Sequence, residues 1–148
     1  MNAHVIDVRN LRKSFGERKV VEGLSLQVDK GEICGFLGAN ARYLLGTFIS
    51  ERWGAAFPYG TFVINVTGSF ILGFFMAYVQ DRQWLEPNIR LLFAVGFVGA
   101  YTTFSTFEYE TMRLMQQGEM MLAMANVFGS LLAGVVAVFA GFALGSSI

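Results

Sequence analysis

The stretch GFVGAYTTFSTFEYE, residues 96–110, combines features that rarely occur together in an apolar segment. Four of the five residues 102–106 carry hydroxyl groups, and two phenylalanines three residues apart are interleaved with them. Gly96 and Gly99 precede this cluster and favour close backbone approach or a break in a helix. At membrane depth such a break must be buried in protein or line a cavity, and its freed carbonyls can coordinate a cation. We therefore predict a broken membrane helix here.

The composition of the whole chain also indicates a membrane protein. Of 148 residues, 54 % are hydrophobic and only 15 % are charged, whereas a soluble domain carries about 25 % charged residues. The 11 basic and 11 acidic residues balance, so the charge does not suggest a nucleic-acid-binding protein. A single cysteine excludes an intramolecular disulfide, and a single histidine excludes a histidine-rich metal site.

Long charge-free runs predict an all-α membrane protein with four transmembrane helices. A helix needs about 20 residues to cross a bilayer, and each of the three longest runs can hold about one span. The fourth span is the least certain because Arg42 lies in its middle, which costs roughly 2.5–3.5 kcal/mol at a bilayer centre. We expect Arg42 to face a partner helix or a watery cavity. The runs are residues 53–80, 91–107 and 120–148, and the predicted helices are 34–50, 60–80, 89–107 and 120–145.

Residues 1–34 differ from the rest and are not expected to form an independent domain. Short alternating runs suggest a β-like or disordered extension, and residues 5–38 resemble the start of an ABC-transporter ATPase. A phosphate loop beginning at Gly38 needs glycine, lysine and serine or threonine at residues 43–45, where the chain has Tyr, Leu and Leu. We therefore expect no nucleotide binding. The segment is interpreted either as a fusion accident or as a regulatory tail.

Residues 35–148 resemble the CrcB/Fluc fluoride-channel family. The family's central motif is close to GFxGGxTTFSTF, which residues 96–107 match except that Ala100 stands where the family has a second glycine. Two further stretches look like the family's first-helix and second-helix motifs, namely GANARYLLG (38–46) and PYGTFVINVTGSFILG (58–73). The resemblance implies a channel that passively exports fluoride from the cytoplasm and so relieves its toxicity.

The same resemblance implies roles for particular residues. Fluoride is strongly hydrated, so a pore must replace its water with hydrogen-bond donors and positive ring edges. The Arg42 side chain would attract anions at a vestibule. The backbone carbonyls of Gly99 and Thr102 would hold a structural Na⁺ at the dimer interface. The expected fluoride-pore residues are Asn65, Phe104, Ser105, Thr106, Phe107 and Ser130.

The family resemblance further implies a dual-topology, antiparallel homodimer in the inner membrane of a bacterium. Its partners would be fluoride, the lipid bilayer and a second copy of the chain. One alternative is a small dual-topology drug/proton antiporter, which needs a titratable carboxylate within a span. The acidic residues nearest to a span are Glu108 and Glu110, at the end of the third. A second alternative is a non-functional fusion of an ATPase start with a channel.

The balance of basic residues bears on how the chain inserts. Lys and Arg in short flanking segments favour the cytoplasmic side. Beyond residue 34, with Arg42 left out, the N-terminal side carries Arg82 and Arg90, and the opposite side carries Arg52 and Arg113. The first 34 residues add six basic residues to the N-terminal side, so that two against two becomes eight against two.

We predict that the full chain inserts mainly with its N-terminus in the cytoplasm. A glycosylation tag or a cysteine-accessibility assay at each end of the chain reports the orientation. Replacing the six basic residues of segment 1–34 with glutamine should restore a mixture of both orientations, because the remaining count is even. An even mixture from the unaltered chain would contradict the prediction.

Overall fold

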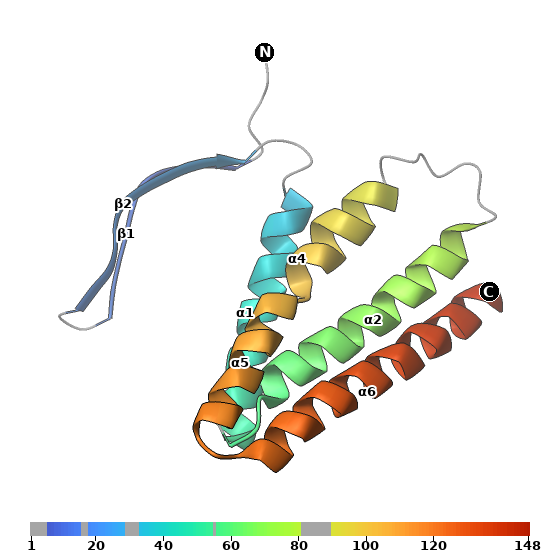
Figure 1. The fold of residues 1–148 in the computed structure, drawn as a ribbon. Helices are drawn as coiled ribbons and strands as arrows, with labels where there is room; N and C mark the ends of the chain where they lie inside the picture. The colour runs from blue at the N-terminus through green and yellow to red at the C-terminus, as the bar shows by residue number, and fades with distance from the viewer. Residues whose placement is uncertain (1–5, 16–17, 29–32, 55, 81–89) are drawn as a thin grey trace. The chain divides into compact units, whose positions relative to one another are not determined.

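The computed structural model describes residues 6–15, 18–28, 33–54, 56–80 and 90–148. The chain forms two compact units, which divide after Ile33. The described residues comprise a two-stranded sheet in the first unit and helices in the second (Figure 1). Arg82 and Lys30, which enter the charge count above, lie outside the described residues, as does the predicted start of the third helix at residue 89.

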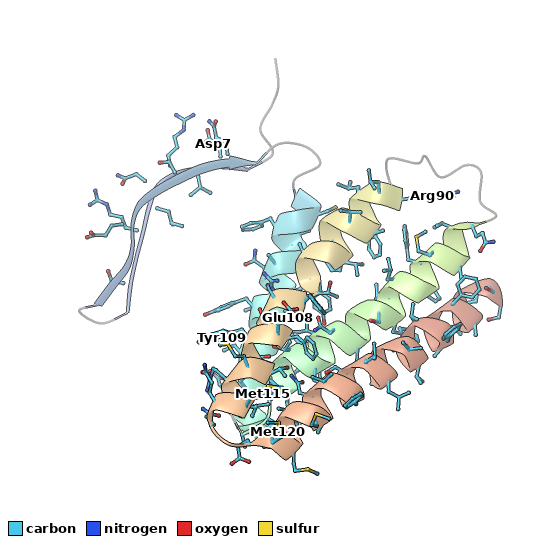
Figure 2. The ribbon with its side chains drawn as sticks, in the orientation of Figure 1. Asp7, Arg90, Glu108, Tyr109, Met115 and Met120 are labelled. Atoms are coloured by element: carbon cyan, nitrogen blue, oxygen red, sulfur yellow. The ribbon has the colours of Figure 1, made fainter. Side chains whose placement is uncertain are left out.

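The first unit is an antiparallel pair of strands, β1 (Ile6–Phe15) and β2 (Arg18–Val28). Ile6 lies opposite Val28, and the register becomes irregular beyond Val8. Asn10 adopts a positive φ of 53° at this irregularity, and its N–H donates to Ser25 Oγ at 3.0 Å. An isolated two-stranded hairpin is at best marginally stable in water, and the exposed Asp7–Arg9 pair (Asp7 is labelled in Figure 2) adds little.

The first helix, α1 (Ile33–Trp53), includes the residues at which the ATPase-like start of the chain would need a phosphate loop. A phosphate loop presents non-helical backbone N–H groups to the phosphates. Residues 38–45, where that loop would lie, are instead part of the continuous helix α1. Their N–H groups are therefore committed to helical hydrogen bonds, which agrees with the missing lysine.

The second helix, α2 (Tyr59–Gln80), and the last, α6 (Met120–Ser146), are each long and apolar enough to cross a membrane. Only 11 % of the most apolar window of α6 is buried within the chain, and 28 % of that of α2. The core helix of a soluble protein would be mostly buried. Exposed apolar surface on this scale fits a protein whose surroundings are lipid.

The segment predicted as the third span consists of the π-helix η1 (Leu92–Val98), α4 (Gly99–Tyr101) and α5 (Phe104–Gln116). The prediction that it ends at residue 107 was wrong, because α5 continues to Gln116. Glu108 and Arg113 lie on the exposed face of an amphipathic helix and Glu110 is half-buried, while Thr111 and Leu114 are buried. Gly118, with a φ of 82°, then provides the left-handed residue that commonly terminates a helix.

Helices α2 and α6 run side by side and pack through glycine (Figure 1). A Cβ placed on Gly141 would collide with the carbonyl oxygen of Phe70, and one on Gly145 would collide with that of Phe74. Because these neighbours are backbone atoms, they cannot rotate away. The contact therefore requires the small residues that bring membrane helices together.

We predict that Gly141→Ala lowers the free energy of unfolding by about 1–3 kcal/mol, because the added methyl group forces α2 and α6 apart. Thermal unfolding of the protein in detergent measures the change. Gly129→Ala, on the same helix, is the matched control, since a Cβ there meets nothing within 4 Å. Equal stabilities of the two variants would contradict the close packing.

Candidate functional site

The predicted break in the third span is present and covers two residues. Thr102 has φ −80° and ψ 161°, and Thr103 has φ −150° and ψ 116°, so both are extended. Helix α5 restarts at Phe104, and the Thr103 hydroxyl caps it by accepting from the N–H of Thr106 at 3.3 Å. The threonines of the motif thus end one helix and begin the next.

The side chain of Asn65 on α2 bridges the break. Its Nδ2 donates to the carbonyl oxygen of Thr103 at 3.0 Å, and its Oδ1 accepts from the N–H of Thr103 at 2.9 Å. One carboxamide therefore satisfies both backbone polar groups of an extended residue, as a neighbouring strand would. An amide nitrogen carries two hydrogens, and this contact uses one of them.

The same bridge changes which hydrogen bonds the backbone carbonyl groups before the break can accept. In a continuous α-helix the N–H of Thr103 would donate to Gly99, four residues earlier. Here it donates to Asn65, so that the Gly99 carbonyl loses its helical partner. The carbonyl oxygen of Thr102 lies 3.4 Å from Nη1 of Arg42, which reaches the break from α1. Arg42 therefore faces a partner helix, as predicted, and its charge lies beside a backbone oxygen.

Most of the predicted pore residues line one groove of about 360 Å³. The rings of Phe104 and Phe107 lie 5.8 Å apart and tilted by 34°, and the Phe104 side chain is 72 % exposed. The predicted residues that line this groove are Asn65, Gly99, Thr102, Phe104, Phe107 and Ser130.

The other predicted residues do not share this groove. Arg42 and Thr106 line a second hollow of about 590 Å³, which also contains Glu51 and Glu110. Ser105 is exposed and is not among the described residues that line either hollow. Thr103 lines both, so the break separates the two hollows and contributes to each.

A buried polar network between α5 and α6 supports the groove. Asn126 is 1 % exposed, and its Nδ2 donates to Thr111 Oγ1 at 2.9 Å, while its Oδ1 accepts from Ser130 Oγ at 3.3 Å. Thr111 in turn donates to the carbonyl oxygen of Phe107 at 2.8 Å. The sequence suggests only that Asn126 bridges helices. Asn126 orients Ser130 directly and Phe107 through Thr111. Nothing in the sequence pattern singles out Thr111 for this contact.

Comparison with known proteins shows the family. A sequence model described as "CrcB-like protein, Camphor Resistance (CrcB)" matches residues 32–142, three quarters of the chain. The chain belongs to the CrcB family. The hairpin lies outside the range that matches this family, and the broken helix with both hollows lies inside it.

Curated relatives within the CrcB family carry a more specific name. A protein of Acidobacterium capsulatum named "Fluoride-specific ion channel FluC" is 50 % identical over 114 residues, 77 % of this chain and 91 % of its own length. Proteins of the same name from Koribacter versatilis and Aquifex aeolicus are 46 % and 38 % identical over 114 residues each. These alignments cover 77 % of this chain and 90 % and 92 % of the relatives.

We predict that Asn65→Leu lowers the free energy of unfolding by about 1–3 kcal/mol, because it leaves both backbone groups of Thr103 without their partner. Thermal unfolding in detergent is the measurement. Asn40→Leu is the matched control, since Asn40 bonds only to Phe36 within its own helix, at an exposed position. If both variants were equally stable, the bridge would not hold the break.

Proposed function

We propose that this chain is a fluoride-specific ion channel that exports fluoride passively from the bacterial cytoplasm across the inner membrane. The observation that carries the proposal is the name shared by relatives 38–50 % identical, whose aligned region includes most of this chain. The groove beside the helix break supports it independently. That groove combines ring edges, an amide and a hydroxyl, without a charged residue in its lining.

The chemistry of the groove suits a small anion that has lost its water. The edges of Phe104 and Phe107 carry the positive part of the ring quadrupole and can face an anion. The second N–H of Asn65 is a hydrogen-bond donor at the same groove, and the hydroxyl of Ser130 would become one by turning away from Asn126 Oδ1, to which it donates in the structure. Neutral donors replace the hydration shell without binding the ion too tightly to leave.

The second hollow would supply the ion. The Arg42 guanidinium would supply the positive charge that attracts an anion, opposed by Glu51 and Glu110 in the same lining. The Thr103 hydroxyl donates to Thr106 Oγ1 at 2.9 Å, which leaves the Thr106 hydrogen to bond elsewhere. Ser105, on the exposed side of α5, would act as a pore residue only where another surface covers it.

A second, inverted copy of the chain is part of this proposal. The open groove and the exposed Phe104 ring are supporting observations, because both would be closed by a partner. The carbonyls of Gly99 and Thr102 fit a structural Na⁺ by donor type, and the Gly99 carbonyl is released from its helix. Two oxygens are only part of a coordination shell, so the partner would supply others. Arg42 would have to release the Thr102 oxygen.

A channel explains the arrangement better than a proton-coupled carrier. A carrier needs a titratable carboxylate placed in the path of its substrate. The residues that line the groove are neutral. Glu108 lies on α5 next to Tyr109, on the C-terminal side of the break, and its side chain is exposed (Figure 2). Glu110 is half-buried and lines the second hollow, outside the groove.

Purified protein in liposomes, with a fluoride electrode outside, tests the proposal. We expect the loaded vesicles to release fluoride and to retain chloride. A version with residues 1–34 replaced by an apolar helix start shows whether the hairpin impairs transport. The absence of release from both versions, or equal release of chloride, would contradict the proposed function.

We predict that Phe104→Ile lowers fluoride release at least tenfold without changing the oligomeric state, because isoleucine fills similar space without a positive ring edge. Phe139→Ile is the matched control, since Phe139 is equally exposed, at 69 %, but lies on α6 outside the groove. Unchanged flux through the Phe104 variant would remove the role assigned to this ring.

A further inference from the structure

Tyr101, the last residue before the helix break, makes a polar contact that the pore chemistry does not use. Its side chain is only 6 % exposed, and its phenol oxygen lies 2.7 Å from Oγ1 of Thr67 on α2. Thr67 Oγ1 also lies 2.7 Å from the carbonyl oxygen of Val63, which can only accept. The threonine hydrogen therefore goes to Val63, and Tyr101 donates to Thr67.

The ring of Tyr101 belongs to an aromatic stack along the third span. It lies nearly parallel to Phe97, at 6° and 6.3 Å, and Phe97 stacks on Phe93 at 5.5 Å. Phe93 in turn contacts Phe75 on α2, with centroids 4.3 Å apart. The stack fixes the ring plane, and the hydroxyl provides a directional link from Tyr101 to α2.

Helix α2 also approaches the residue after Tyr101. A Cβ on Gly68 would collide with Cγ2 of Thr102 and would lie 3.3 Å from the ring of Tyr101. Glycine at position 68 lets the break lie this close to α2 with Thr102 in its present rotamer. The following residue, Thr103, is bound by Asn65. Three consecutive residues of the third span thus each meet a residue of α2.

We propose that Tyr101 and Thr67 form a positioning pair that fixes where the first half of the third span ends. The hydroxyl contact sets the rotation and height of Tyr101, and through the short link of Thr102 and Thr103 it sets the direction in which Phe104 emerges. Neither hydroxyl touches the ion. The effect on transport rests on the proposed function, whereas the effect on the break does not.

Tyr101→Phe tests the pair, because it removes one oxygen and keeps the aromatic stack. Amide hydrogen exchange of the purified protein, read on peptides that contain Thr102 and Thr103, should become about 2- to 10-fold faster. Thr67→Val should produce the same change, and Thr67→Ser, which keeps the hydroxyl, should restore the original rate. Tyr109→Phe is the matched control, since Tyr109 lies beyond the break and is 58 % exposed.

Two further readouts separate positioning from general stability. Fluoride release per folded protein should fall in Tyr101→Phe and Thr67→Val and should recover in Thr67→Ser, while the unfolding temperatures stay close to the original. A loss confined to the unfolding temperature would assign the pair a purely structural role and overturn the proposal, as would unchanged exchange at the break. If the original chain releases no fluoride, the proposed function fails, and the exchange measurement still tests the pair.

Discussion

The double hydrogen bond between the Asn65 carboxamide and the backbone of Thr103 is the interaction on which the rest of the site depends. A lipid environment offers no water to an unpaired N–H or C=O, so a membrane helix can be interrupted only where protein replaces its lost bonds. One side chain does so here, with the geometry of a strand partner. Without it, the third span would have to close its helix through Thr103, and the groove, the second hollow and the exposed Phe104 ring would be reorganised together.

The break places two different environments on either side of one residue. Thr103 borders an uncharged groove with ring edges and also a hollow that contains Arg42 and two glutamates. Attracting an anion and removing its water require different surroundings. A positive charge speeds the arrival of the ion, but a strong charge where the ion loses its water would keep it from leaving. In the proposed channel, separating the guanidinium from the rings by an extended dipeptide would let one short segment serve both.

Much of this arrangement could be predicted from the sequence. Gly96 and Gly99, just before the hydroxyl and phenylalanine cluster, indicated the break. The three charge-free runs indicated three of the four helices, and the fourth was predicted despite Arg42. The predicted third helix stops too early, at residue 107, whereas α5 continues to Gln116. The charged residue at 108 resembles a helix boundary in the sequence, because the sequence does not show that it lies on an exposed face of α5. The contacts of Thr67 and Asn126 could not be predicted, since each depends on how two helices are rotated and shifted against one another. Periodicity fixes the face of a helix but not its register against a neighbour.

The glycine contacts between α2 and α6 also limit how the protein can move. Both helices meet backbone to backbone near Gly141 and Gly145, so no side chain there can change rotamer to accommodate sliding. We therefore expect the two helices to move together. Asn65 and Thr67 belong to α2, so in the proposed channel the partners of the break would form part of this helix pair, and a gating motion would displace α1 or the two halves of the third span against it.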